Sequence, residues 1–264
     1  MSTFATVTLA LPCREITPSW AWQGSTGEGV RVAVIDSGIN ATHRAVGGRI
    51  SGYVSIRRSP SGLVYDEQPH RDEIGHGTAC AGLIRSIAPE CELYSVQVID
   101  PTGVGDGGVL AAGLEWAVEH GMHVCNVSVG TPSVAAAALL RDVADRAYFR
   151  DIVVVAAANN APEPSFPWML SSVVSVSATS TAGPFSFYIN PRPPAEFAAA
   201  GCDVPIPWME GWTTATGSSF AAPHLAGVVT RIRSKHPHIS VAELKVVLRA
   251  LASNANSQDV GPRR

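Results

Sequence analysis

Cysteine is scarce in this chain of 264 residues. None of the cysteines forms a Cys-X-X-Cys pair, and they are too scattered for a disulfide framework. The five cysteines are Cys13, Cys80, Cys91, Cys125 and Cys202. Because their number is odd, at least one thiol is unpaired, which favours reduced cysteines in a cytoplasm.

Long hydrophobic runs are also lacking. The longest apolar stretches are interrupted by Gly, Ser, Asn or Pro and fall short of the roughly 18 residues that a membrane-spanning helix needs. Residues 4–11 are mildly apolar, but no Lys or Arg precedes them and the run is short for a signal peptide. We therefore predict a cytoplasmic protein with no role at a membrane, and secretion is the minority alternative.

Charge is low and nearly balanced. Charged residues make up 16% of the chain and hydrophobic residues 46%, a composition that excludes intrinsic disorder and fits one compact domain. The net charge is −3, and no basic stripe with interleaved aromatic residues is present. Nucleic acid is therefore not an expected partner, and no particular oligomeric state is predicted.

Short apolar runs rich in β-branched residues alternate with helical patterns. Runs typical of buried strands lie at Val30–Asp36, Leu93–Ile99, His123–Val129, Ile152–Ala157 and Val173–Ala178, and helical patterns at Gly108–His120, Ser133–Phe149, Ser219–Lys235 and Ser240–Ala252. This alternation predicts an α/β fold with a mostly parallel central sheet between two layers of helices. The proline-rich segment Pro184–Trp212 is predicted to be a long surface loop.

Two polar residues are candidates for a functional site, and the first lies at the end of a strand, where a parallel sheet binds its ligands. Asp36 ends the first strand, and His76 lies between Gly75 and Gly77 at the start of a helical run. Taken singly, the aspartate could accept hydrogen bonds from a turn, and the histidine could be a helix-start or core residue.

A serine stands at the start of another predicted helix, in the segment GSSFAAPHLAG. A hydroxyl there can attack a carbonyl group while its own backbone N–H helps to hold the oxyanion, although a serine in this place is more often only a helix cap. Together, Asp36, His76 and Ser219 supply a carboxylate, an imidazole base and a nucleophile.

Three motifs resemble those of the subtilisin-like serine proteases, the subtilase superfamily, over about residues 20–252. VAVIDSGI surrounds Asp36, HGTACAG begins with His76, and GSSFAAPHLAG contains Ser219. Ser219 rather than Ser218 matches the nucleophile, because Ala221 and Pro223 then follow at the family's spacing. The resemblance implies a subtilisin-like fold and an endopeptidase that works through an acyl-enzyme. The implied domain spans residues 20–252, between an N-terminal extension, 1–19, and a C-terminal tail, 253–264, expected to be flexible.

The resemblance also implies an oxyanion-hole asparagine and a substrate-binding channel. VVVAAANN ends with two asparagines, and the alanine register favours Asn160, while Asn159 stands where the family usually has glycine. Either amide could serve, or both could cap the turn. A peptide or protein substrate is expected to bind as an extended strand between Gly103-Val104-Gly105 and Ser128-Val129-Gly130, unless these glycines are ordinary turn residues.

The chain departs from the family pattern in two places. The aspartate of the family's calcium site is replaced by Ala45, and no loop interrupts the helix after His76, so we expect no required metal and no cofactor. Only about 16 residues precede Thr17, which leaves no room for an inhibitory pro-domain, and we expect an intracellular processing protease that acts on a peptide or protein precursor. Peptide macrocyclisation, or peptide binding without catalysis, are the alternatives.

Overall fold

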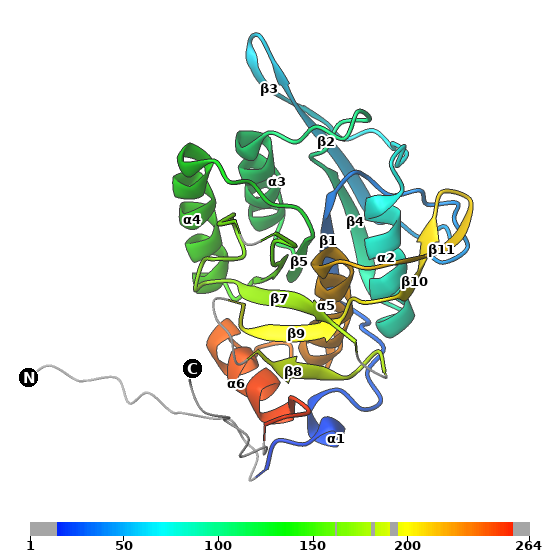
Figure 1. Ribbon diagram of the computed structural model, residues 1–264, viewed down its shortest axis with the longest axis vertical. Helices are drawn as coiled ribbons and strands as arrows, with labels where there is room; N and C mark the ends of the chain where they lie inside the picture. The colour runs from blue at the N-terminus through cyan, green and yellow to red at the C-terminus, as the bar shows by residue number, and fades with distance from the viewer. Residues whose placement is uncertain (1–14, 162, 181–182, 191–194, 256–264) are drawn as a thin grey trace, which may run out of the picture.

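A nine-stranded sheet forms the centre of the molecule (Figure 1). The computed structural model describes residues 15–161, 163–180, 183–190 and 195–255. The strands are β1 Arg31–Asp36, β2 Gly52–Ser59, β3 Gly62–Asp66, β4 Glu92–Gln97, β5 Val124–Val127, β6 Val153–Ala157, β7 Val174–Thr179, β8 Phe187–Ile189 and β9 Phe197–Ala200. Their order is β3-β2-β4-β1-β5-β6-β7-β9-β8, with antiparallel pairing only at the two edges, β2 with β3 and β8 with β9. The predicted α/β fold with a mostly parallel sheet is confirmed.

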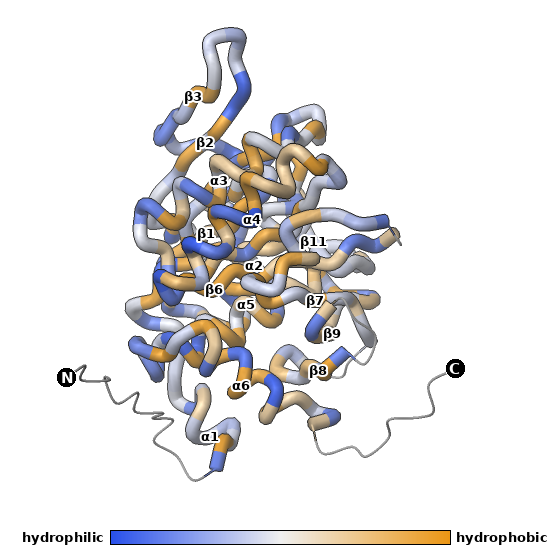
Figure 2. The backbone as a smooth tube through the Cα atoms, turned by 90° about the vertical axis from the view of Figure 1, so that its left-hand side faces the viewer, coloured by the Kyte–Doolittle hydropathy of each residue, from blue (hydrophilic) through white to orange (hydrophobic). Residues whose placement is uncertain are grey.

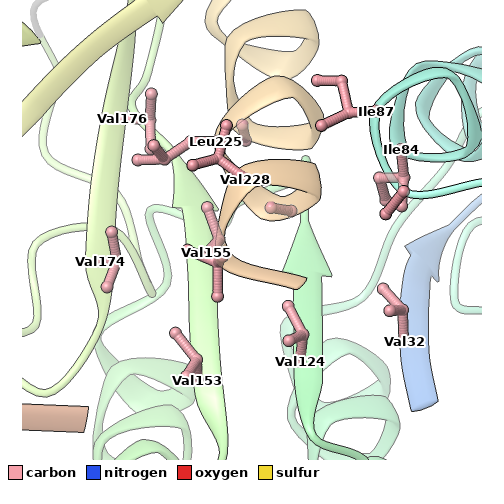
Figure 3. Packing of buried hydrophobic residues seen from close by; sticks show 14 of the residues in the cluster. Val32, Ile84, Ile87, Val124, Val153, Val155, Val174, Val176, Leu225 and Val228 are labelled. Atoms are coloured by element: carbon pink, nitrogen blue, oxygen red, sulfur yellow. The ribbon is translucent and has the colours of Figure 1, made fainter. Parts of the chain in front are cut away.

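Helices cover both faces of this sheet. They are α1 Pro18–Ala21, α2 His76–Ile87, α3 Gly107–Glu119, α4 Val134–Phe149, α5 Ser218–Lys235 and α6 Val241–Leu251. Because side chains alternate along a strand, β1 sends Val32 and Val34 into the core under α2 and α5, and Ala33 and Ile35 into the core under α3 and α4. Figure 3 shows the first core, where side chains of the strands meet Leu225 of α5. The burial of both faces explains why these strands are continuous apolar runs.

The helix starts follow the sequence signals closely. Ser240 and Glu243 form the predicted capping box, with the Ser240 hydroxyl accepting a hydrogen bond from the backbone N–H of Glu243. Asp106 caps α3 by accepting hydrogen bonds from the backbone N–H groups of Gly108 and Val109. These caps provide acceptors for backbone N–H groups at the starts of α6 and α3.

Two hairpins were not predicted. Strands β2 and β3 form one that stands clear of the body of the molecule in both views (Figures 1 and 2). The other consists of β10 Val204–Trp208 and β11 Gly211–Ala215 and packs against α2. The prediction of a long loop over Pro184–Trp212 was therefore wrong, because β8, β9 and β10 all lie within it.

The ends of the described chain lie against the body. Trp20 stacks on His236 with ring centroids 4.2 Å apart. In the segment predicted to be a flexible tail, the side chain of Asn254 bonds to both the backbone N–H and the carbonyl of Ile189, so the tail is docked as far as residue 255. The rest of that tail and residues 1–14, with Cys13, lie outside the described residues. None of the helices in the described residues has the length and apolar character that crossing a membrane requires.

Candidate active site

The three predicted active-site side chains come from the carboxyl edge of the sheet. Asp36 is the last residue of β1, His76 is the first residue of α2, and Ser219 is the second residue of α5. Helices α2 and α5 pack directly against each other beside β1. The fold thus brings together residues that are 40 and 143 positions apart in the sequence, the differences 76 − 36 and 219 − 76.

Asp36 and His76 are joined by a hydrogen bond. Nδ1 of His76 lies 2.8 Å from Oδ1 of Asp36, whose side chain is completely buried. The same oxygen accepts a hydrogen bond from the backbone N–H of Ser37 at 2.8 Å. Since an ionised carboxylate only accepts hydrogen bonds, Nδ1 of His76 carries the proton and Nε2 of the neutral ring is left as a base.

The surroundings of His76 favour its protonated form. Burial acts to lower the pKa of His76, but the negative charge of Asp36, its hydrogen bond, and the more distant charge of Asp72 outweigh burial and raise the pKa above 6.5. The imidazole is therefore suited to accept a proton from an attacking hydroxyl and to hold it while the reaction proceeds.

Asp72 organises the start of the histidine helix, a part that the sequence analysis did not identify. Its buried carboxylate accepts hydrogen bonds from the backbone N–H groups of Gly75 and Thr78, both at 2.8 Å, and from the hydroxyl groups of Ser37 and Thr78. The signal was present in the sequence, because an aspartate three residues before a helix-starting glycine is a typical local acceptor for exposed N–H groups.

The glycine that follows His76 allows β1 and α2 to approach each other. A Cβ atom on Gly77 would lie 2.1 Å from the carbonyl oxygen of Gly38, so any side chain there would push the helix away from the aspartate. The backbone N–H of Gly77 donates to the hydroxyl of Ser37 at 3.0 Å. The Gly77 position in the histidine motif is thus explained by packing.

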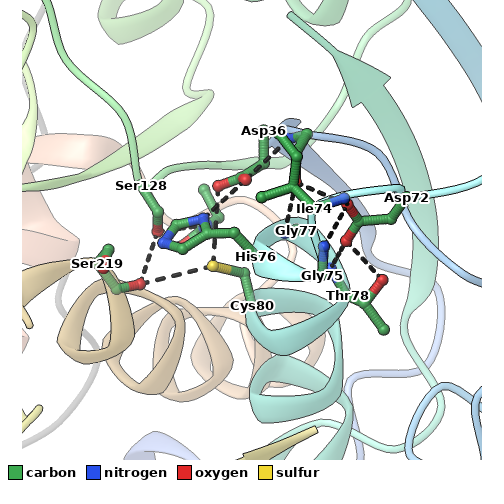
Figure 4. Close-up of polar contacts among 12 residues, drawn as sticks. Asp36, Asp72, Ile74, Gly75, His76, Gly77, Thr78, Cys80, Ser128 and Ser219 are labelled. Carbon is green, nitrogen blue, oxygen red and sulfur yellow. Dashed lines mark hydrogen bonds and ion pairs between the residues drawn. The ribbon is translucent and has the colours of Figure 1, made fainter. Parts of the chain in front are cut away.

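Ser219 lies opposite the imidazole. In Figure 4 the ring of His76 lies between the side chains of Asp36 and Ser219. Among the described residues, His76 and Ser219 share no hydrogen bond, as is common when no substrate holds the two groups together. The Ser219 carbonyl accepts hydrogen bonds from the hydroxyl of Ser128 at 2.9 Å and from the thiol of Cys80 at 3.5 Å, which fixes the first turn of α5.

The two asparagines after β6 point to different partners. Oδ1 of Asn160 accepts a hydrogen bond from the backbone N–H of Ser218 at 2.9 Å, so the amide nitrogen Nδ2 is free to donate. This Nδ2 and the Ser219 hydroxyl oxygen lie 3.4 and 3.2 Å from the point that a Cβ atom on Gly217 would occupy. Asn159 instead donates from Nδ2 to the carbonyl of Glu163 at 3.1 Å.

Two cavities lie along the predicted substrate channel. One of about 190 Å³ begins at Ser219 and is lined by residues 128–130, 132, 157–160, 163 and 165. The other, about 370 Å³, is lined by Gly103 and Gly105 on one side and by Val129 and Gly130 on the other. Val104 is 64% exposed and lines a neighbouring cavity. The two predicted segments therefore flank one groove, while the Ser128 hydroxyl is directed toward Ser219.

The residues near α2 do not fit the family's calcium site. Helix α2 runs without a break from His76 to Ile87. The methyl group of Ala45 lies 3.1 Å from the point that a Cβ atom on Gly82 would occupy, so this segment packs directly on the helix. Within the described residues, the only group of three His, Cys, Asp or Glu side chains close enough to share an ion is Asp36, His76 and Cys80. Burial raises the pKa of the Cys80 thiol, which makes it a poor metal ligand.

Comparison with known proteins agrees with this fold. The model of the subtilase family matches residues 27–263. Subtilisin DY of Bacillus licheniformis is 32% identical over 251 residues, which cover 88% of this chain and 86% of the relative. Subtilisin Savinase of Lederbergia lenta is 33% identical over 90% of this chain and 88% of its own. Among solved structures, the S41 psychrophilic protease superimposes with a TM-score of 0.72 at 24% identity, over 85% of this chain and 83% of that one.

The fold and the relatives together define a serine endopeptidase. The chain belongs to the subtilase family.

Proposed function

We propose that Ser219 is the nucleophile of this protease and that His76 is its general base. The hydroxyl oxygen of Ser219 attacks the carbonyl carbon of the scissile peptide bond while Nε2 of His76 takes the hydroxyl proton. The tetrahedral intermediate then collapses, the C–N bond breaks, and the leaving amine takes that proton from His76. Water repeats the sequence on the acyl-enzyme and releases the second product.

The observation that carries this proposal is the buried hydrogen bond of 2.8 Å between Asp36 and His76. It holds the ring in the tautomer whose Nε2 is free, and it stabilises the imidazolium that forms during attack. Burying an ionised carboxylate away from water costs free energy. The proposed mechanism uses this buried charge to orient the imidazole of His76.

Asn160 is the proposed side-chain donor of the oxyanion hole, together with the backbone N–H of Ser219. Its Oδ1 is held by Ser218, so its Nδ2 stays directed toward the space beside Ser219. A donor fixed before the reaction stabilises the developing charge without having to reorient.

The substrate is proposed to bind as an extended strand between residues 103–105 and 128–130. Gly103, Gly105, Val129 and Gly130 line one groove, and their small size would let the backbone of an added strand approach closely. Affinity would then come from main-chain hydrogen bonds and selectivity from the two cavities.

An intracellular processing role on a peptide or protein precursor is our proposal for the physiological task. It is supported by the thiols, since Cys80, Cys91, Cys125 and Cys202 are all free. A secreted role is the alternative, and one relative at 32% identity is by its name the minor extracellular protease Epr of Bacillus subtilis. Incubation with a panel of unrelated folded proteins separates narrow processing, which leaves most of them intact, from general degradation.

Labelling with a fluorophosphonate tests the proposed chemistry directly. The reagent is expected to attach to Ser219 in the intact protein and to be lost in Ser219→Ala and His76→Ala. Ser218→Ala is the matched control, because the Ser218 hydroxyl contacts the backbone N–H of Ala178 and should leave labelling in place. No labelling at neutral pH would instead favour a noncatalytic peptide-binding module.

Product masses distinguish hydrolysis from peptide macrocyclisation on the same fold. A hydrolase adds one water across the cleaved bond, whereas a cyclase transfers the acyl group to an amine and leaves the water out. We expect the mass of one water to be gained for each bond cleaved.

A further inference from the structure

The cavity that begins at Ser219 contains one charged side chain among the residues that line it. That residue is Glu163, and the other lining residues are neutral. Because Ser219 and Asn160 both line this cavity, we assign it to the side chain of the residue whose carbonyl carbon lies at Ser219. This residue, on the acyl side of the cleaved bond, is called P1 below.

Among the described residues, no cation pairs with the carboxylate of Glu163. In residues 15–161, 163–180, 183–190 and 195–255, no ion pair or side-chain hydrogen bond involves this group. Glu163 is exposed and is one of the residues that line the cavity. A negative charge that lines a binding cavity and is left unpaired attracts a positive charge on the ligand.

The loop that carries Glu163 is held in place by Asn159. The side chain of Asn159 donates to the carbonyl of Glu163 at 3.1 Å and accepts from the backbone N–H of Ala161 at 3.3 Å. The backbone bonds between Thr131 and Phe166, both 2.9 Å, join the far end of the same loop to the segment after β5. Hydrogen bonds therefore hold the chain at Asn159 and at Phe166, on either side of Glu163.

The walls of the cavity suit a long aliphatic stem. Ala157, Ala158, Val129 and Gly130 offer small apolar surfaces. The buried hydroxyl of Ser165 already accepts a hydrogen bond from Nε1 of Trp168 at 2.8 Å. A lysine or arginine side chain can lay its methylene groups on these walls and bring its cation toward Glu163.

We infer that Glu163 makes this enzyme prefer lysine or arginine at P1, with Asn159 as the residue that positions Glu163. The inference rests on the proposed function, since it needs Ser219 as nucleophile. An apolar P1 side chain would remove water from the carboxylate without pairing it, whereas a cation compensates for the lost water. Because Glu163 is exposed, water and salt weaken the attraction, and we expect a preference of about 5- to 20-fold.

Peptides that differ only at P1 test the inference. We would measure kcat/KM for lysine, arginine, norleucine and glutamate, norleucine having the stem of lysine without its charge. The intact enzyme should cleave the lysine and arginine peptides about 5- to 20-fold faster than the norleucine peptide, and added salt should reduce that ratio. A norleucine peptide cleaved as fast as the lysine peptide, or faster, would overturn the inference.

Three variants assign the preference to particular residues. Glu163→Gln should abolish the preference for lysine, and Glu163→Lys should favour the glutamate peptide. Asn159→Ala should lower the ratio of the lysine rate to the norleucine rate, whereas a merely structural loss would lower both rates together. Glu28→Gln is the matched control, since Glu28 is exposed and precedes the opposite end of β1. A full preference for lysine in Glu163→Gln would also overturn the inference.

Phosphonate inactivators with lysine or norleucine at P1 separate this inference from the proposed function. They need only a reactive Ser219. If neither reagent inactivates the enzyme and no fluorophosphonate label attaches, the proposed function fails. If both inactivate it at equal rates, Ser219 is still supported as the nucleophile, and the preference for a cation at P1 is refuted.

Discussion

Oδ1 of Asn160 accepts a hydrogen bond of 2.9 Å from the backbone N–H of Ser218, the residue before the proposed nucleophile. This bond ties the end of β6 to the start of α5. It also settles the orientation of the amide, because an N–H group can only donate and the atom that faces it must be the oxygen. The amide nitrogen is consequently fixed on the side of Ser219, as an oxyanion donor must be.

The first prediction concerns this donor. Asn160→Ala should lower kcat by about 100- to 1,000-fold and change KM little, because the lost bond forms to the oxyanion and not to the ground-state carbonyl. Steady-state kinetics on one peptide are sufficient. Asn159→Ala is the matched comparison and should lose far less kcat on a norleucine peptide; equal losses in both variants would mean that Asn160 has no special role.

The second prediction concerns Asp36. Asp36→Asn should lower kcat on the order of 10,000-fold, because an amide can donate to Nδ1 and so hold the imidazole in the wrong tautomer. Fluorophosphonate labelling of the same variant should slow in parallel. Far-UV circular dichroism should be unchanged, and an Asp36→Asn enzyme of near-normal rate would remove the carboxylate from the mechanism.

The third prediction concerns pH. Since the pKa of His76 is raised and the reaction needs the neutral ring, kcat/KM should fall as pH decreases through a midpoint above 6.5. Asp72→Asn removes one of the charges that raise this pKa, so the midpoint should move to lower pH. A pH–rate profile of both proteins measures the shift, and a midpoint that is unchanged or higher in Asp72→Asn would contradict it.

Much of this site could be predicted because its residues stand at the ends of strongly patterned elements. The run VRVAVID is apolar on both faces of the sheet, and its end at Asp36 follows from its composition. The predicted strands and helices agree with the observed ones to within one or two residues. The hydrophobic pattern of the sequence was sufficient to predict these strands and helices, whose core-facing residues are buried along the element.

The features that the sequence did not predict depend on contacts between distant segments. Strands β10 and β11 were missed because Pro205 and Pro207 indicate a loop, yet an isolated two-stranded ribbon tolerates proline at its open side. Glu163 was missed for a related reason. It lies in a loop without periodicity, and the pairing of Thr131 with Phe166, 35 residues apart (166 − 131), brings that loop to the cavity.

The fourth prediction concerns metal dependence. A chelator should change neither kcat/KM nor the midpoint of thermal unfolding, because Ala45 packs against Gly82 where the family's calcium site would need carboxylate oxygens. Calcium added back should also have no effect. Activity that a chelator abolishes and calcium restores would show that another set of oxygens binds the ion.

The fifth prediction concerns the stability of the histidine helix. Asp72→Ala removes the acceptor of the buried backbone N–H groups of Gly75 and Thr78 and of the half-buried N–H group of Ile74. Since each buried donor without a partner costs about 1–3 kcal/mol, we expect the free energy of unfolding to fall by about 3 kcal/mol or more. Urea unfolding in a Ser219→Ala background, where the protein cannot digest itself, measures this change.

Asp66→Ala is the control for that measurement. Asp66 also accepts a backbone N–H, from Gln68, and its ion pair with Arg57 spans 3.8 Å, but both side chains are about half exposed. Water replaces such contacts easily, so its removal should cost less than about 1 kcal/mol. If the two variants lose the same stability, burial is not what makes Asp72 important, and the cluster of donors around it would be no more than a surface turn.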